Sequence, residues 1–104
     1  MGKQPTFKRE QTGALAFANK VREKLGLKPM DKLVKGNIGL ASHCPITNTI
    51  LARTRRGLRV STGYRRCEIY DKDGAHIAAV PLTEMASRFA RKFDEGSFPD
   101  LSAD

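Results

Sequence analysis

The spacing of apolar residues along the chain begins with a helical pattern. From Thr12 onward, apolar side chains recur three or four positions apart and form one stripe, which consists of Ala14, Phe17, Ala18, Val21 and Leu25. Gly26 follows where glycine commonly ends a helix. We therefore predict a first helix over residues 13–25.

A second, shorter helix is predicted from Pro45. Before it, residues 27–42 contain proline and glycines that interrupt regular structure, so we expect an ordered linker there. Proline suits the first position of a helix, and Ile46, Ile50 and Leu51 would form the buried stripe. Cys44 is then expected at the N-cap of this helix, and Gly57 is expected to stop it.

The period changes from 3.6 to 2 after Gly57, which is typical of strands. Apolar and polar residues alternate over 58–62, 66–70 and 76–80. Pro81 is expected to open a last helix that ends at Gly96 and has one apolar face, formed by Leu82, Met85, Ala86, Phe89 and Phe93. The pattern predicts an α+β fold in the order ααβββα, with about three helices over one face of a small three-stranded antiparallel meander.

A chain of 104 residues has room for one core. We expect residues 1–11 to be a flexible basic arm, residues 12–101 to form a single α+β domain and residues 102–104 to fray. The expected core positions are those on the apolar stripes, namely Phe17, Val21, Leu25, Ile46, Ile50, Val60, Ile69, Ile77, Met85, Phe89 and Phe93.

The formal charge of +8 is distributed unevenly. Residues 1–36 carry a net charge of +6, residues 37–67 hold six arginines and no acid, and residues 68–104 carry a net charge of −4. Such asymmetry favours an anionic partner. No apolar run approaches the roughly 20 residues that span a bilayer, and the start of the chain lacks a secretion signal. We therefore expect no membrane partner and a cytoplasmic location, with both cysteines reduced.

The candidate catalytic and metal-binding residues are few. His43, Cys44, Cys67 and His76 do not match the paired spacing of zinc sites. At an N-cap, Cys44 is either a reactive thiol favoured by the helix dipole or simply a small capping residue. No triad or carboxylate pair can be assembled around it. We expect a protein that is not an enzyme and that needs no cofactor or metal.

The arginine-rich middle of the chain is the strongest functional signal. Arg59 and Arg66 alternate with buried positions, so they should share the open face of the sheet with Tyr70. Basic side chains interleaved with aromatic ones suit the backbone and bases of nucleic acid. The predicted binding surface for nucleic acid or another anionic partner consists of Arg53, Arg55, Arg56, Arg59, Tyr64, Arg65, Arg66 and Tyr70. The alternatives are a solvated basic face and, for Arg53, Arg55 and Arg56, a favourable interaction with a helix C-terminus.

Three features also carry a resemblance to small proteins of actinobacteria and actinobacteriophages that have no established activity. They are the run His43-Cys44-Pro45-Ile46-Thr47-Asn48, the arginine-rich hairpin, and the stretch from Phe89 to Gly96 with the following Phe98-Pro99-Asp100-Leu101. The resemblance implies a small accessory protein that binds DNA or interferes with a host protein. The second hypothesis is therefore an interaction module or inhibitor that binds an acidic host surface or forms a homodimer through Ile38, Leu40, Phe98 and Leu101.

Overall fold

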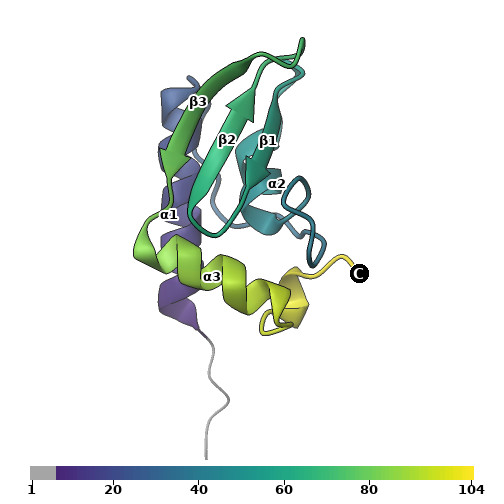
Figure 1. Ribbon diagram of the computed structural model, residues 1–104. Coiled ribbons are helices and arrows are strands. Elements are labelled where there is room, and N and C mark those ends of the chain that lie inside the picture. Colours follow the sequence, from purple (N-terminus) through teal and green to yellow (C-terminus); the bar gives the residue numbers. More distant parts are fainter. Residues whose placement is uncertain (1–6) are drawn as a thin grey trace, which may run out of the picture.

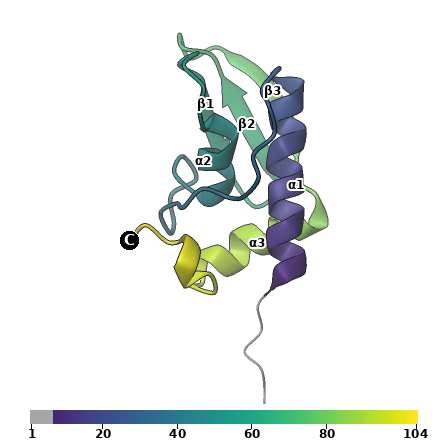
Figure 2. The ribbon, with the colours of Figure 1, turned by 180° about the vertical axis from the view of Figure 1, so that it is seen from behind.

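The computed structural model describes residues 7–104 and has the predicted α+β architecture. Its elements are α1 (Lys8–Lys24), α2 (Pro45–Leu51), β1 (Arg59–Thr62), β2 (Arg66–Tyr70), β3 (His76–Pro81), α3 (Glu84–Asp94) and a short 3-10 turn (Pro99–Leu101). Figure 1 shows the sheet in front of α1 and α2, with α3 crossing α1 beyond the end of the sheet. From behind, Figure 2 shows the helices over the sheet, so one face of the sheet is left open.

Helix α1 begins earlier than the sequence pattern predicted. Lys8–Gln11 are helical and therefore do not belong to a flexible arm. The ring of Phe7 packs edge-on against the ring of Phe98, with centroids 5.6 Å apart, and this contact attaches the start of the helix to the core. The rest of the predicted arm, residues 1–6, lies outside the described residues.

Helix α2 has the predicted start but an earlier end. Cys44 is the N-cap and its Sγ accepts a hydrogen bond from the Thr47 N–H. The helix ends at Leu51, and Arg53 adopts a left-handed backbone with φ 61°. The last turn contains no basic residue. The dipole of α2 therefore does not account for Arg53, Arg55 and Arg56, which lie in the loop that follows.

The sheet is an antiparallel meander in the order β1-β2-β3. Val60 pairs with Ile69 and Thr62 with Cys67, and all four side chains are buried on the helix-covered face. Between β2 and β3 the pairing shifts, because Ile69 faces Ala78 whereas Tyr70 faces His76. Ile77 is the extra residue of this β-bulge. Its side chain is 49% exposed, so its assignment to the core was wrong.

Helix α3 is capped by Thr83, whose side chain accepts the N–H of Ala86. Pro81 is the last residue of β3 and does not open the helix as expected. Gly96 follows the helix with φ 85°, a conformation that glycine adopts without strain, in agreement with the predicted end. Helix α3 crosses α1 at Gly13, where a Cβ would lie 2.3 Å from Cβ of Met85.

The apolar faces meet in one core. Eight of the expected positions are buried, while Leu25 and Met85 are half-buried. The core also takes in threonine hydroxyls, since Thr47 Oγ1 donates to the carbonyl of Ala41 over 2.7 Å and lies 2.8 Å from Thr62 Oγ1. These contacts allow polar side chains to be buried without loss of hydrogen bonding.

The end of the described chain is attached to the 36–38 loop and not frayed as expected. Gly36 forms a parallel bridge with Ser102, in which its carbonyl accepts the N–H of Ala103 over 2.8 Å. The Asp104 carboxylate accepts hydrogen bonds from the Asn37 side chain and the Ile38 N–H. Phe98 is buried, at 3% exposure, and fixes the segment that leads to this bridge.

Candidate functional site

The eight residues predicted to form one binding surface lie in two groups at opposite ends of the sheet. Arg59 pairs with Tyr70 at one end, whereas Arg66 begins β2 at the other. Four residue steps separate Arg66 from Tyr70 along β2, a distance of about 13 Å. Arg53, Arg55, Arg56, Arg59 and Tyr70 thus form one group, and Tyr64, Arg65 and Arg66 form the other.

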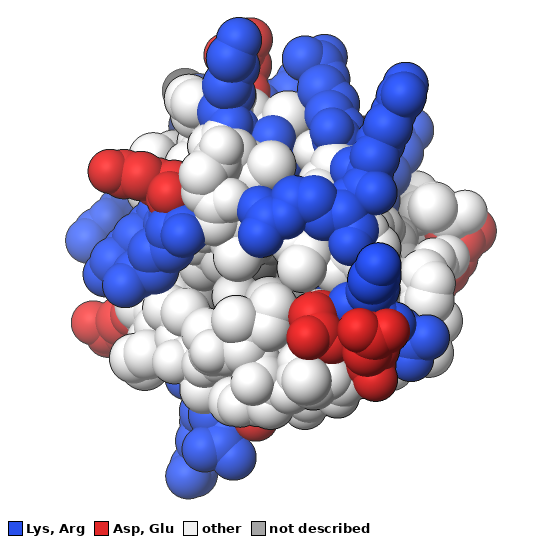
Figure 3. All heavy atoms as spheres, turned by 90° about the horizontal axis from the view of Figure 1, so that it is seen from above, with Lys and Arg blue, Asp and Glu red and all other residues white. Residues whose placement is uncertain are grey.

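The first group belongs to a larger cluster that we call the basic end. It unites the C-terminus of α1, the α2–β1 loop and the β2–β3 turn, and its cations are Lys24, Lys28, Arg53, Arg55, Arg56, Arg59 and Lys72. Arg56 Nη1 donates to the carbonyl of Leu25 over 2.5 Å, and a Cβ on Gly57 would lie 3.1 Å from Cβ of Lys72. Figure 3 looks down on this end, where Lys and Arg side chains gather and acidic ones are fewer.

Arg22, which is not one of the apolar stripe residues of α1, holds the α2–β1 loop in position. Its guanidinium is buried, at 3% exposure. Nη1 donates to the carbonyls of Thr49, Ile50 and Ala52 at 2.7–3.0 Å, and Nε donates to Lys28 at 2.6 Å. Burial lowers the pKa of Arg22, and repulsion from Arg53 lowers it further. The sequence signal for the burial of Arg22 is weak: the residue directly follows Val21, which belongs to the apolar stripe.

The arginines of the basic end are not neutralised by ion pairs. Within residues 7–104, none of Arg53, Arg55, Arg56 and Arg59 has a carboxylate within ion-pair distance. Asp71 is close by, but its carboxylate accepts the N–H groups of Asp73 and Ala75 and so closes the β2–β3 turn. The charge of these four guanidinium groups is therefore available to an external anion, although one nitrogen of Arg56 is bonded to the carbonyl of Leu25.

The second group lines a shallow depression of about 520 Å³ that we call the hairpin-tip pocket, formed mainly by Tyr64, Arg65, Arg66, Glu68 and Arg91. Arg66 Nε lies 3.5 Å from Glu68, which also contacts Nε2 of His76 at 2.9 Å. Arg66 therefore has an acidic partner, which lies just outside the acid-free range of residues 37–67. Arg91 does not form an ion pair with Glu95, four residues further along α3; its guanidinium lies over the Tyr64 ring, 5.1 Å from the centroid.

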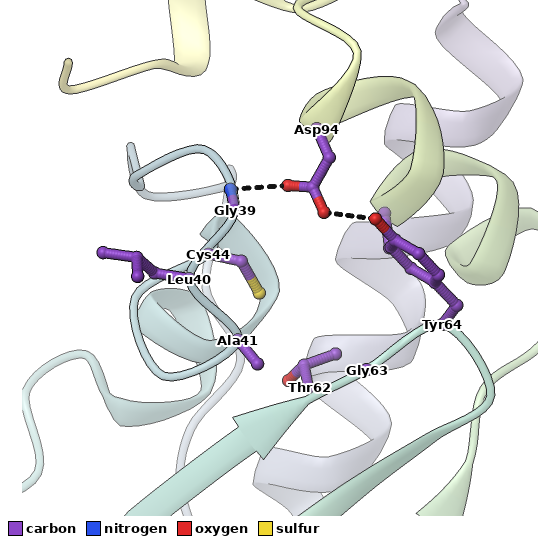
Figure 4. Close-up of a pocket in the computed structure, with 9 residues that line it drawn as sticks. Gly39, Leu40, Ala41, Cys44, Thr62, Gly63, Tyr64 and Asp94 are labelled. Carbon is purple, nitrogen blue, oxygen red and sulfur yellow. Dashed lines mark hydrogen bonds between the residues drawn. The ribbon is translucent and has the colours of Figure 1, made fainter.

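A third feature is a pocket of about 230 Å³ beside Cys44, between the 39–41 loop, the β1–β2 turn and α3. Figure 4 shows the Asp94 carboxylate between the Gly39 N–H, at 2.9 Å, and the Tyr64 hydroxyl, at 2.5 Å. The hydrogen bond to Asp94 raises the pKa of Tyr64. The Cys44 Sγ is directed toward the enclosed space but accepts the N–H of Thr47, as expected of a capping residue.

Both cysteines are free and buried. Cys67 lies next to Thr62 across the β1–β2 pair, and its burial raises the pKa of the thiol to about 11. The His43 ring lies 2.9 Å from the Ser42 hydroxyl and does not line the Cys44 pocket. In the part of the chain that the structure describes, no three His, Cys, Asp or Glu side chains gather as a metal site.

The apolar patch expected around the linker and tail is smaller than predicted. Ile38 and Leu40 are 37% and 51% exposed, but Phe98 is buried and Leu101 is half-buried against the core. The exposed part of the patch therefore consists of the two linker residues alone, of which Leu40 lines the Cys44 pocket.

None of the helices formed by residues 7–104 is both long and apolar enough to cross a membrane. No protein-family model matches the chain, and no curated protein or solved structure shows significant similarity to it.

Proposed function

We propose that this protein binds nucleic acid, without catalysis, through phosphate contacts made by the basic end. The observation that carries the proposal is the convergence of three segments, distant in sequence, whose cations share one end of the molecule. The four arginines among them have no carboxylate partner within residues 7–104. Guanidinium groups bind phosphate oxygens with two parallel hydrogen bonds, so they suit a polyanionic backbone.

The geometry favours contact with the backbone over the reading of bases. Tyr70, the aromatic residue of this group, is half-buried and its ring packs edge-on against His76, 5.3 Å away. The exposed aromatic side chain, Tyr64, lies at the other end of β2. Phosphate contacts fix a protein on nucleic acid but carry no sequence information. We therefore expect binding that is nearly independent of sequence.

The test is a titration of a short mixed-sequence DNA duplex at several salt concentrations. Phosphate contacts release counterions, so about four contacts should give a slope of log K against log salt of about −3.6. Replacing Arg55 and Arg56 together by alanine should weaken binding to every sequence alike and flatten the slope by about 2.

The matched control is Lys32→Ala with Lys35→Ala. It removes the same two positive charges from the 27–42 linker, whose side chains at these positions are also exposed. A general effect of net charge would weaken both double variants equally, and this result would contradict the proposed site. The absence of any duplex binding at low salt would reject nucleic-acid binding altogether.

If no duplex binding is found, we propose the second hypothesis, namely that the protein is an accessory protein that binds an acidic host protein or forms a homodimer. The exposed residues Ile38 and Leu40, the second of which lines the Cys44 pocket, favour this hypothesis. For either function we propose a cytoplasmic location, since free buried thiols suit a reducing compartment.

A further inference from the structure

The hairpin-tip pocket combines positive charge with two planar side chains, the Tyr64 ring and the Arg91 guanidinium that lies over it. Three arginines and one glutamate face it, so its lining carries excess positive charge. Arg65 and Arg66 come from the β1–β2 turn and the start of β2, and Arg91 comes from α3. Segments distant in sequence thus bring the three cations to one depression of about 520 Å³.

Part of this charge remains available to a ligand. The Glu68 carboxylate lies within ion-pair distance of Nε of Arg66, and the same carboxylate contacts Nε2 of His76. Within the described residues, Arg65 and Arg91 have no carboxylate in ion-pair distance. Arginine is the side chain best suited to hold a phosphate by two hydrogen bonds, and several arginines around one depression favour a dianion over a single negative charge.

The Tyr64 ring is held in place before any ligand binds. Its hydroxyl donates to Asp94 over 2.5 Å, and Asp94 is itself fixed by the N–H of Gly39. The Arg91 guanidinium lies over the ring, and the tyrosine is still 41% exposed. Nucleobases stack on aromatic rings and on arginine planes, and a surface ordered in advance lowers the entropic cost of binding.

We propose that the hairpin-tip pocket binds a nucleoside monophosphate unit, with its phosphate on Arg65 and Arg66 and its base on the Arg91–Tyr64 pair. Such a unit is either a free nucleotide or the 5′-phosphorylated end of a strand. The site does not rest on the proposed function, because the basic end lies about 13 Å away along β2.

The experiment follows amide chemical shifts in phosphate-free buffer during titration with adenosine 5′-monophosphate, adenosine or inorganic phosphate. We expect the nucleotide to bind more tightly than either of its parts and to shift residues 61–68 and 91. Arg65→Gln should weaken nucleotide binding about ten-fold, through the loss of one charge-assisted hydrogen bond. Tyr64→Leu should abolish the preference for the nucleotide over phosphate.

Arg88→Gln is the control, because Arg88 is exposed on the same helix and pairs with Glu84 instead of lining the pocket. Arg65→Gln keeps Tyr64 and its bond to Asp94, so it tests the site even if Tyr64→Leu unfolds the tip. Equal affinity for nucleotide and inorganic phosphate, shifts confined to the basic end, or no shifts at all would overturn the proposal.

The source of the ligand is distinguished in the Arg55→Ala, Arg56→Ala background, where the basic end is weakened. A single strand with a 5′-phosphate is compared with the same strand ending in a hydroxyl. Tighter binding of the phosphorylated strand than of the free nucleotide assigns the site to strand ends, and the reverse order assigns it to free nucleotides. Equal affinity for the two strands, together with no binding of free nucleotide, would overturn the site.

Discussion

Arg22 places a full positive charge in the interior of the protein, where it bonds to carbonyl oxygens and not to a carboxylate. The side chain joins the end of α1 to the end of α2, because the carbonyls of Thr49, Ile50 and Ala52 converge on one nitrogen. These oxygens belong to the last turn of α2 and the residue after it, which leave carbonyls without partners inside the helix. The charge therefore acts as a C-cap supplied by another helix.

Replacing Arg22 by methionine keeps much of the side-chain volume but removes the donor that these carbonyls share. The Thr49 carbonyl still accepts the N–H of Ala52, whereas the carbonyls of Ile50 and Ala52 lose their partner. We expect the free energy of unfolding to fall by about 3 kcal/mol or more. Arg22→Lys should be intermediate, since one ammonium cannot reach both Lys28 and the end of α2 as the guanidinium does. Urea unfolding followed by circular dichroism measures both changes.

Arg88→Met serves as the comparison, because this arginine is exposed and forms a single i,i+4 pair with Glu84. It should change stability by no more than about 0.5 kcal/mol. If Arg22→Met unfolded at the urea concentration of the original protein, water would satisfy the carbonyls and Arg22 would not be a structural cap.

At the scale of elements, the crossing of α1 and α3 depends on a missing side chain. Gly13 lies inside α1, where alanine would be the better helix former. It is nevertheless required there, because a Cβ would lie 2.3 Å from Cβ of Met85 and 3.5 Å from its Cα. Neither atom is the end of a flexible side chain, so the helices themselves would have to separate.

Gly13→Ala should therefore destabilise the protein by about 1 to 3 kcal/mol, in spite of its gain in helix propensity. Thr12→Ala changes the preceding, exposed position of the same helix and should be neutral or slightly stabilising. Thermal unfolding of the two variants separates packing from propensity. A higher melting temperature for Gly13→Ala would show that the crossing can relax.

The elements and the sites differ in how far the sequence could predict them. Local signals are sufficient for the cap at Cys44, the proline after it and the glycine that follows α3, and these predictions are confirmed. The binding surface was predicted as one unit because alternation places Arg59 and Arg66 on the same face of the sheet. The register of the hairpin places these two residues at opposite ends of that face, which alternation alone does not reveal. The position of Ile77 depends on a bulge, which the alternation of residues does not reveal.

At the scale of the whole molecule, titration of a buried group changes the stability of the entire fold. Cys67 is fully buried, and its thiol has a pKa raised from 9.0 to about 11. Unfolding exposes the thiol to water and returns its pKa to the lower value. Between these two pH values the unfolded chain has lost the proton and the folded chain still holds it, so stability falls as pH rises.

We expect the free energy of unfolding to fall by about 2 to 3 kcal/mol between pH 9 and pH 11 through Cys67. The Tyr64 phenol, whose pKa is also raised, should add to the loss above pH 10. Denaturant unfolding across this range measures the slope, with Cys67→Ala and Tyr64→Phe as comparisons. An identical slope in Cys67→Ala would show that the buried thiol does not contribute.

The bulge in β3 also bears on how the protein behaves in concentrated solution. β3 is an edge strand, and an edge that is long, flat and apolar offers unpaired backbone groups to another molecule. The extra residue at Ile77 interrupts this edge, and Pro81 ends it without an N–H to donate. Only residues 78–80 are left as regular edge, which is too short to recruit a foreign strand. An exposed isoleucine can therefore remain in the strand without making it a site of aggregation.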